Sequence, residues 1–525
     1  SRGDAFSIDR TGGSLTRDCD YRNIPSAFCF TIDDSEFKNI RPASIMNIVT
    51  DIRESTRERL DRIAVVEQDR QWSYGQLLDV VARLRGQLEG QGIGLGSRVA
   101  FRCADGFEFI AGSLALLEAG AAIVPVDVSL SDHEAAATIS RIDVHGFLFQ
   151  HGTFTETPGD AAVGTDELAQ GFIWQPRRTD DPAETSNPCD ALAPAFIRFS
   201  SGTTGASKGV VLSHQSIYDR TEAANAGLQI SDRDRILWVL QMSHHFVVSI
   251  LLFLRKGATI VIAHHDFPMS IIHTASEGSI TFIYASPFHY HLLATNDAIR
   301  PEALQNVRLA ISTAMKLPPA TGRAFADKFG FDLAEAYGII EVGLPFINLH
   351  PAANSRGSVG RMLPAYELRL ENPDAEGVGE VLIRGKGMFD AYYSPWQLRE
   401  DALDDGWFRT GDLGCLDPDG NLQIAGREKS VIICAGMKIF PVEVEQVLNA
   451  HPDVKESLVF GVDHPIYGQT PEAKVVASKP DADPASLRRE LRRYCYAELS
   501  SYKVPKSFTL VPSLPRTTSG KLCRR

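Results

Sequence analysis

The sequence predicts an α/β protein that carries a smaller α+β domain at its C-terminal end. Short apolar runs alternate with helical patterns as far as about residue 350, and a strand-rich stretch follows them. From Lys429 the chain changes to a shorter alternation of strands and helices. Because strand–helix–strand units with short links form parallel sheets that are buried on both faces, the long first part is expected to contain such a sheet.

The first regular element is expected after residue 42, because residues 1–42 are polar and show little periodicity. Ser73 can cap a helix, since its side chain can accept a hydrogen bond from a free main-chain N–H. The apolar positions of this helix recur at helical spacing: Leu77, Val81, Leu84 and Leu88. Gly90, Gly92 and Gly94 are expected to end it.

A strand–helix–strand unit follows in "SRVAF", "FEFIAGSLALLEAG" and "AAIVPV", within residues 97–126. Residues 152–193 contain Pro, Thr, Asp and Gly without periodicity, and we expect a long surface connection there. The strand-rich stretch contains "YELRLE", "GEVLIRG" and "LQIAG", which lie between residues 366 and 426.

The C-terminal pattern predicts a separate domain over residues 429–525. Its expected strands are "SVIICAG", "SLVFGV" and "EAKVVAS". Pro441 opens the helix "VEVEQVLNA" at the position where proline is tolerated best, and "ASLRRELRRYCYAEL" reads as a second helix. The chain is therefore predicted to have an N-terminal extension (1–42), a large domain (43–428) and a small C-terminal domain (429–525).

Composition and charge exclude several classes of protein. The 525 residues are 44% apolar and 23% charged, and the net charge of −13 argues against nucleic acid as a partner. The eight cysteines include no C-x-x-C pair and no His/Cys cluster with zinc spacing, which favours reduced thiols. The sequence shows neither an apolar run long enough for a membrane helix nor a signal peptide. We therefore expect a cytoplasmic protein without a membrane span.

The clearest chemical signal is "FIRFSSGTTGASKGVVLSH", residues 196–214, in which two β-like runs flank a loop of glycines, hydroxyl residues and one lysine. Glycines let main-chain amides approach a phosphate closely, hydroxyls donate hydrogen bonds, and lysine supplies charge. A Walker P-loop is excluded, because its G-x-x-x-x-G-K-[ST] pattern is absent. The composition alone leaves two interpretations open, a phosphate loop and an ordinary hairpin turn.

This stretch closely resembles the phosphate loop of the adenylate-forming superfamily, which includes acyl-CoA synthetases, peptide-synthetase adenylation domains and beetle luciferases. The usual form is T-S-G-T-T-G-x-P-K-G, in which Ser200 here replaces the first Thr and Ser207 replaces the Pro. Four further segments resemble superfamily motifs in the same order: "GSVGRMLP" (357–364), "GWFRTGDLG" (406–414), "GREKSVIICAGMKIFPVEVE" (426–445) and "PRTTSGK" (515–521). The chain is therefore identified as a member of this superfamily, in its acyl-CoA ligase branch.

The resemblance implies a fold and a motion. The large portion would contain two doubly wound sheets plus a small barrel-like sheet, and would end near residue 428. The small mobile C-terminal domain would rotate about Lys429. One pose would bring Lys521 to the substrate carboxylate and the α-phosphate for adenylation. The other would bring the CoA tunnel at Ala435 and Gly436 into place for thioester formation.

The resemblance also implies a nucleotide site. Its residues would be Ser200, Ser201, Gly202, Thr203, Thr204, Gly205, Lys208, Tyr337, Gly338, Ile340, Asp412 and Arg427. The Tyr337 ring would stack on adenine, Asp412 would accept from the ribose hydroxyls, and Arg427 would contact the ribose region. Glu341 would hold Mg²⁺ beside the triphosphate, since a hard cation prefers oxygen ligands. The implied cofactors are ATP (which becomes AMP in an acyl-adenylate), Mg²⁺ and coenzyme A.

The segment "YGIIEVG", residues 337–343, departs from the superfamily's Y-G-x-T-E, because Ile340 stands where a Thr or Ser donates to the α-phosphate. A hydrogen bond to a charged group contributes ~1.5–3 kcal/mol. Three interpretations stay open. The chain is a complete ligase whose neighbouring groups compensate, or an adenylation-impaired relative that only forms CoA thioesters from acyl-adenylate supplied by another enzyme, or a non-catalytic acyl-adenylate-binding module.

The acyl pocket implied by the resemblance lacks the aspartate with which amino-acid-activating relatives bind an ammonium group. Its residues would be His244, His245, Val247, Val248, Ser286, Ser312, Thr313, Ala314, Gly338 and Leu344. The apolar members favour an aliphatic, alicyclic or aryl carboxylic acid, or its acyl-adenylate. "STA" at residues 312–314 stands where the superfamily usually has G-G-A, which should reshape the pocket.

His244 aligns with the residue that gates the pocket in related ligases, and would be catalytic beside Lys521 and Glu341. The alternative is that His244 and His245 are hydrogen-bonded structural residues. CoA is expected as the acceptor in preference to a carrier protein, because the hinge segment resembles that of acyl-CoA ligases. The sequence does not name the acid or the oligomeric state.

Overall fold

The computed structural model describes residues 46–130, 132–154, 165–177, 187–199, 208–263, 267–271, 280–351, 357–434, 437–464, 468–479, 483–499, 501–516 and 522. By its internal contacts the chain separates into residues 1–45 and residues 46–525. The predicted N-terminal extension lies outside the described residues, as do the loop residues 200–205, the tunnel residues Ala435 and Gly436, and Lys521.

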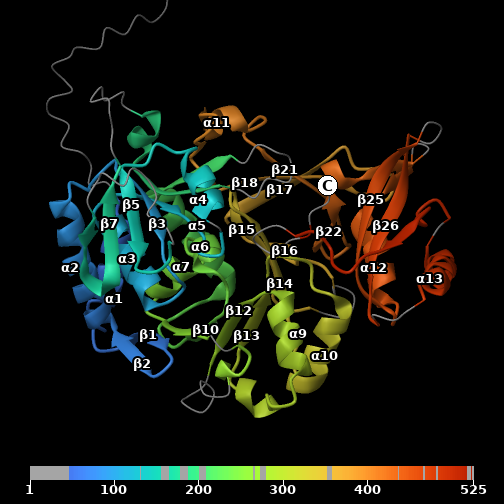
Figure 1. The fold of residues 1–525 in the computed structure, drawn as a ribbon, viewed down its shortest axis with the longest axis horizontal. Helices are drawn as coiled ribbons and strands as arrows, with labels where there is room; N and C mark the ends of the chain where they lie inside the picture. Colours follow the sequence, from blue (N-terminus) through green and yellow to red (C-terminus); the bar gives the residue numbers. More distant parts are fainter. Residues whose placement is uncertain are drawn as a thin grey trace, which may run out of the picture. The chain divides into compact units, whose positions relative to one another are not determined.

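The first large sheet has nine strands among the described residues (Figure 1). In order across the sheet they are β16 (Arg361–Met362), β15 (Gly343–Asn348), β14 (Ala334–Ile339), β13 (Leu309–Ser312), β12 (Phe282–Ala285), β10 (Arg235–Trp238), β11 (Thr259–Ile262), β1 (Ile63–Glu67) and β2 (Arg70–Ser73). The central strands from β14 to β1 run parallel. At the edges β2 pairs antiparallel with β1, β15 with β14, and β16 with β15.

The second large sheet also has nine strands within the described part of the chain. In order they are β20 (Gln397–Leu398), β19 (Ala391–Tyr392), β9 (Gly209–Ser213), β8 (Pro194–Phe199), β4 (Ala122–Pro125), β3 (Arg98–Arg102), β5 (Gly146–Gln150), β7 (Phe172–Pro176) and β6 (Asp166–Glu167). Its centre, from β8 to β5, is parallel. Both sheets therefore have the parallel centre that the strand–helix alternation predicts.

The stretch 152–193 is not the featureless connection that its composition predicts. It contains β6, β7 and two 3₁₀ turns, η2 (Ala169–Gly171) and η3 (Pro188–Leu192), and β7 extends the second sheet beside β5. Trp174 of β7 is 1% exposed and covers Gly146, where a Cβ would come within 2.3 Å of the indole. A short buried strand such as this one has no periodicity by which the sequence could reveal it.

Helices cover the two large sheets and pack between them. Their bounds are α1 (Ile48–Thr56), α2 (Tyr74–Gly90), α3 (Phe107–Glu118), α4 (Asp132–Ile139), α5 (His214–Leu228), α6 (Met242–His245), α7 (Ile250–Arg255), α9 (Pro287–Thr295), α10 (Pro319–Phe329) and α11 (Arg399–Ala402), with the 3₁₀ turns η4 (Pro301–Leu304) and η5 (Glu428–Ser430). As predicted, Ser73 caps α2, since its Oγ accepts from Gln76 N. No helix in the described part of the chain is long and apolar enough to cross a membrane.

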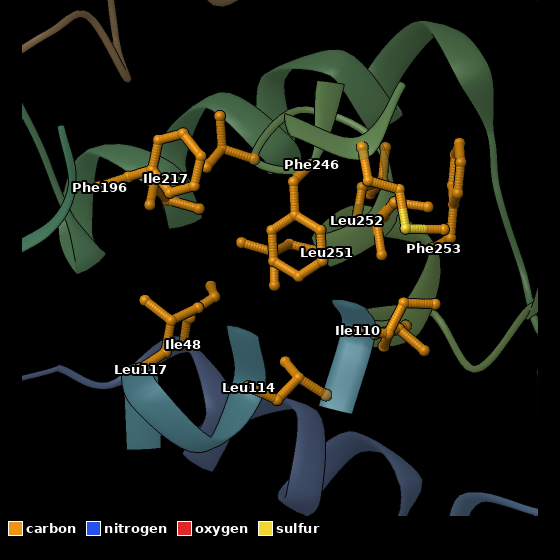
Figure 2. Close-up of a cluster of buried hydrophobic side chains, with 14 of the residues drawn as sticks. Ile48, Ile110, Leu114, Leu117, Phe196, Ile217, Phe246, Leu251, Leu252 and Phe253 are labelled. Carbon is orange, nitrogen blue, oxygen red and sulfur yellow. The ribbon is translucent and has the colours of Figure 1, made fainter. Parts of the chain in front are cut away.

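One hydrophobic core joins the two large sheets, because it takes buried residues from both of them and from the helices between. Figure 2 shows Leu114 and Leu117 of α3 with Ile48 of α1 on one side, and Phe246 with Leu251 on the other. All five are at most 1% exposed. This burial fixes α1, α3, α5 and α7 against each other, and it holds the loops at the strand ends in place.

Two smaller sheets complete the described fold. The first is antiparallel and consists of β17 (Tyr366–Glu371), β18 (Gly379–Gly385), β21 (Phe408–Leu416) and β22 (Leu422–Arg427). The second is built from β24 (Met437–Ile439), β23 (Ile432–Cys434), β26 (Gly468–Ala477), β25 (Val454–His464) and β27 (Phe508–Leu510). Helices α12 (Pro441–Ala450) and α13 (Pro484–Glu498) share a hydrophobic core with the second sheet. The small C-terminal α+β domain of the predicted fold class is confirmed, and its boundary at Lys429 stays a prediction.

Several of the expected site residues, together with Asp127, lie at the carboxyl ends of the parallel strands. Asp127 follows β4, His244 lies in α6 after β10, and Thr313 follows β13. Tyr337 lies in β14, and Glu341 lies in the turn after it. The carboxyl ends of parallel strands are where α/β folds usually bind ligands.

Candidate active site

Three of the predicted nucleotide residues, Tyr337, Asp412 and Arg427, are in contact. Asp412 of β21 and Arg427 of β22 are partners in the antiparallel register, and Arg427 Nε lies 2.6 Å from Asp412 Oδ1. The Tyr337 hydroxyl donates to Asp412 Oδ2 at 2.5 Å. Burial, together with the Asp412 charge, raises the pKa of Tyr337 well above its usual value, so the phenol stays protonated. A carboxylate oxygen has two lone pairs and can accept from more than one donor.

Ile340 and Glu341 lie in the tight turn between β14 and β15. Ile340 is half-buried, and the Glu341 carbonyl accepts from Phe389 N at 2.8 Å. Gly338 permits this geometry, because a Cβ there would come within 2.5 Å of the Gly343 carbonyl oxygen. A larger residue at position 338 would therefore push the two strands apart just before the turn.

Cationic and phenolic groups surround the Glu341 carboxylate. The Tyr392 hydroxyl donates to Glu341 Oε1 at 3.5 Å, and Lys208 Nζ lies 4.2 Å from the centre of the Tyr392 ring. Burial raises the pKa of Glu341, while the charges of Arg427 and Arg198 act in the opposite direction. The described residues contain no group of three or more His, Cys, Asp or Glu side chains that could hold a metal ion. A metal at Glu341 would therefore need further oxygen ligands from a bound phosphate compound.

His244 is held at its ring and at its main chain. Its Nε2 lies 3.2 Å from Asp127 Oδ2, and its carbonyl accepts from Arg198 Nη1 at 2.5 Å. Burial alone would raise the pKa of Asp127, but the adjacent His244 ring and the hydrogen bond that Ser129 N donates outweigh it and lower the pKa to about 2. Asp127 is therefore ionised at every physiological pH, and it orients the imidazole through a charge-assisted contact.

An aromatic wall stands beside His244. The rings of Trp238 and Tyr284 stack with their planes 5° apart and their centroids 6.2 Å apart, and His245 meets both rings edge-on. The Tyr284 hydroxyl donates to Thr313 Oγ1 at 3.4 Å. His245 therefore packs into this wall, while His244 is fixed by Asp127.

The other predicted pocket residues divide by exposure. Val247, Ser312, Thr313 and Leu344 are buried, and Val248 and Ser286 are half-buried. The Ser286 hydroxyl is bonded to His289 Nδ1 at 2.8 Å, within its own helix. Ala314 has φ +71°, a left-handed conformation that favours glycine. Ala314 stands at the Ala of the superfamily's G-G-A, so the left-handed residue is not one of the two positions, 312 and 313, at which a glycine is replaced.

Two family models match most of the chain, although the segment between them, which carries Asp412 and Arg427, lies outside both matches. The family model described as "AMP-binding enzyme" matches residues 52–393, and the one described as "AMP-binding enzyme C-terminal domain" matches residues 443–521. The chain belongs to the AMP-binding enzyme family. The predicted membership of the adenylate-forming superfamily is therefore confirmed.

The curated relatives of this AMP-binding enzyme are ligases that form CoA thioesters. The 3-[(3aS,4S,7aS)-7a-methyl-1,5-dioxo-octahydro-1H-inden-4-yl]propanoyl:CoA ligase of Mycobacterium tuberculosis is 30% identical over 497 residues, which is 89% of this chain and 96% of the relative. The 2-succinylbenzoate–CoA ligase of Bacillus subtilis is 27% identical over 471 residues, which is 88% of this chain and 94% of the relative. The predicted acyl-CoA ligase branch is thereby confirmed.

Solved structures confirm the predicted fold class. The o-succinylbenzoate CoA synthetase of Bacillus subtilis, in complex with the acyl-adenylate intermediate OSB-AMP, aligns with a TM-score of 0.76 and 25% identity over 91% of this chain and 97% of that one. The ATP-bound RpMatB-BxBclM chimera B1 aligns with a TM-score of 0.77 and 24% identity over 91% of this chain and 97% of that one.

Three residues of this candidate site were missed by sequence analysis: Asp127, Arg198 and Tyr392. Asp127 carried a signal, since it is a polar residue just after a buried strand that runs parallel to its neighbours. Arg198 directly precedes the predicted phosphate loop, and burial lowers its pKa to about 10, so it remains charged at neutral pH. Tyr392 lies in an edge strand, where no pattern in the sequence indicates its contact with Glu341.

Proposed function

We propose that this enzyme joins an apolar carboxylic acid to CoA through an acyl-adenylate, with conversion of ATP to AMP and pyrophosphate. The observation that carries the proposal is the contact between Tyr337, Asp412 and Arg427. It offers a buried carboxylate and a fixed cation to a ribose, which ATP and the acyl-adenylate share. The CoA ligases among the relatives support the same class of reaction.

Glu341 would hold Mg²⁺ on the phosphate side of the site. Proteins usually bind this ion through one or two carboxylates together with substrate phosphates, and Glu341 offers one carboxylate beside the Tyr392 hydroxyl. The donor set therefore fits the ion, which when bound would neutralise charge on the phosphates. Lys208 and residues 200–205 would hold the phosphates themselves.

The small domain would supply the other catalytic groups in turn. Lys521 would engage the carboxylate and the α-phosphate during adenylation. Rotation about Lys429 would then bring Ala435 and Gly436 to the path of the CoA thiol. A single fully closed site cannot both expel pyrophosphate and admit a thiol through the same face, which supports the use of two poses.

The acid that we propose carries an alicyclic or aryl ring. Trp238, Tyr284 and His245 form an aromatic wall, and Val247 and Leu344 provide buried apolar surface. We expect these groups to line the acyl pocket, where they would suit a flat or bulky apolar group better than a charged one. The names of the two ligases compared above specify acids with rings, which supports this choice, whereas a further Mycobacterium tuberculosis relative is named for long-chain fatty acids.

A split assay tests the proposal. One arm supplies ring-bearing acids, ATP and Mg²⁺, and follows pyrophosphate release. The other arm supplies chemically made acyl-adenylate and CoA, and follows the thioester. Activity in both arms is the expected result, and activity in neither arm would favour a non-catalytic binding module.

Ile340 supports a second candidate function, an enzyme that forms the thioester only. In that case the acyl-adenylate arm is active and the pyrophosphate arm is not, and another enzyme supplies the adenylate. Adenylation would be impaired because the Ile340 side chain has no hydroxyl to donate to the α-phosphate.

If the enzyme forms the thioester only, Ile340→Thr is expected to raise pyrophosphate release about ten- to a hundredfold, because a restored hydrogen bond to a charged group contributes ~1.5–3 kcal/mol. In a complete ligase, where neighbouring groups compensate, the same change should have little effect. The acyl-adenylate arm should change much less. Ile340→Val is the matched control, since it keeps the branched shape without a hydroxyl. An equal gain in both variants, or no gain with Thr, would contradict the role assigned to the hydroxyl.

Asp127→Asn is expected to raise the KM for the acid and lower the thioester rate about tenfold, because His244 loses a charged partner and keeps only a neutral one. Steady-state kinetics in both arms measure this effect. The folded-state pKa of Asp127, about 2, lies below its ordinary value of 3.8. The Asp127–His244 contact therefore stabilises the wild type above about pH 4, and this stabilisation is lost as the pH falls towards 2.

Asp105→Asn is the control for this prediction. Asp105 Oδ1 accepts from Met242 N at the start of α6, so the change loosens the same helix without touching the His244 ring. Equal effects in the two variants would mean that Asp127 only anchors α6.

A further inference from the structure

A buried arginine lies directly behind the Ile340–Glu341 turn. Arg220 of α5 is 0% exposed, its Nε donates to the Gly387 carbonyl at 2.9 Å, and its Nη1 donates to the Ile340 carbonyl at 3.0 Å. Burial lowers the pKa of Arg220 to about 10, so it stays charged at neutral pH. Among the described residues its Nη2 has no hydrogen-bond partner. A buried cation that serves main-chain carbonyls is costly, which calls for a reason beyond packing.

Two glycines let α5 approach this turn. Gly387 has φ +77°, and a Cβ there would come within 2.3 Å of Arg220 N. Gly343 has φ +108°, and a Cβ there would lie 3.4 Å from Arg220 Cβ. The guanidinium therefore reaches the turn between two positions at which a side chain would obstruct the contact or strain the main chain.

The contact with the Ile340 carbonyl fixes the direction of the next N–H. The Ile340–Glu341 peptide is not among the cis bonds of the described chain, so its C=O and N–H point in opposite directions. With the carbonyl turned to Arg220, the Glu341 N–H is turned away from α5. Burial raises the pKa of the Glu341 carboxyl and its own main-chain N–H acts in the opposite direction, so this N–H and the carboxylate lie on the same side of the turn. A cation on the carbonyl also polarises the amide and strengthens its N–H as a donor.

We propose that Arg220 is a positioning residue that holds the Ile340–Glu341 peptide with its N–H on the phosphate side, so that the main chain supplies the donor that the Ile340 side chain lacks. The inference rests on the proposed function, because it takes the Glu341 carboxylate as the group that faces the phosphates. Arg220 acts through this turn and does not itself touch the nucleotide. We call the contact between Arg220 and the Ile340 carbonyl the clamp. Arg198 and Arg427, whose positive charges also act on Glu341, are not part of it.

Arg220→Met tests the clamp, because methionine fills similar space without charge or donors. Pyrophosphate release is expected to fall about ten- to a hundredfold, and thioester formation from acyl-adenylate and CoA to stay within about threefold of wild type. Arg220→Lys keeps the charge but not the planar set of guanidinium donors, so its rate of pyrophosphate release should lie between those of the wild type and Arg220→Met. Calorimetric binding of ATP with Mg²⁺ should weaken about tenfold in Arg220→Met.

Arg255→Met is the matched control. Arg255 of α7 is also buried, and it pairs with Asp51 at 2.5 Å and with Glu222 at 3.0 Å, away from the turn. Its loss should lower the melting temperature while leaving the ratio of the two half-reactions at the wild-type value. Ile340→Thr, introduced into Arg220→Met, should restore part of the pyrophosphate release, because a hydroxyl then replaces the main-chain donor.

Arg220→Met overturns the inference if it lowers both half-reactions equally, as a purely structural loss would. No change in pyrophosphate release or in ATP binding would overturn it as well. A wild type without pyrophosphate release contradicts the complete-ligase proposal instead. The clamp is then judged by ATP binding, and unaltered binding in Arg220→Met overturns it.

Discussion

Lys521→Ala is expected to lower pyrophosphate release from acid, ATP and Mg²⁺ about 10²- to 10³-fold, the loss typical of removing one preorganised group that stabilises developing charge. The proposed position of the ammonium group is between the attacking carboxylate and the α-phosphate, where negative charge gathers as the new bond forms. Thioester formation from supplied acyl-adenylate and CoA is expected to stay within about threefold of wild type, because Lys521 would have moved away in the second pose. The split assay measures both rates on one preparation.

Lys479→Ala is the matched control for this prediction. Lys479 belongs to the same small domain, its side chain is 73% exposed, and it pairs with Asp453 at 3.5 Å. Exposed pairs of this kind contribute little to stability, so both rates should be unchanged. An equal loss of both half-reactions in Lys521→Ala would contradict the two-pose interpretation.

Local signals in the sequence could predict much of the fold. The helix after Ser73 and the helix that Pro441 opens both appear where their capping residues place them, because a cap acts on the next few residues only. The strands β3 and β4 of the second large sheet were also predicted, since their apolar runs are bounded by turns. The strand at Trp174 was missed because a short buried run without alternation has no distinguishing period.

Contacts between distant parts of the chain could not be predicted in the same way. The motif at 337–341 revealed that a hydroxyl was missing, but not that Arg220, 120 positions earlier, donates to the Ile340 carbonyl. The same holds for Asp127, which meets His244 only because β4 and β10 end near each other. These contacts depend on the packing of the two large sheets. Sequence motifs can therefore identify the candidate reacting groups, whereas the residues that orient these groups are brought to them by tertiary packing and are seen only in the structure.

Asp412→Ala is expected to lower kcat/KM in both arms of the split assay about 10²- to 10⁴-fold. Two hydrogen bonds from ribose hydroxyls to a charged acceptor would be lost, at ~1.5–3 kcal/mol each. Both arms should suffer, because ATP and the acyl-adenylate present the same ribose. Tyr337 and Arg427 would also lose the acceptor that orients them. Kinetics in both arms, with a melting curve to verify folding, measure the effect.

Two variants separate ribose binding from a local loss of structure. Tyr337→Phe removes the hydroxyl that donates to Asp412 but leaves the carboxylate in place, so it should reduce both rates far less than Asp412→Ala. Asp401→Ala changes an exposed aspartate of α11 and should leave both rates unaltered. If Asp412→Ala abolished adenylation alone and left thioester formation intact, Asp412 would act on the triphosphate and not on the ribose. The shared loss is therefore the result that the ribose assignment requires.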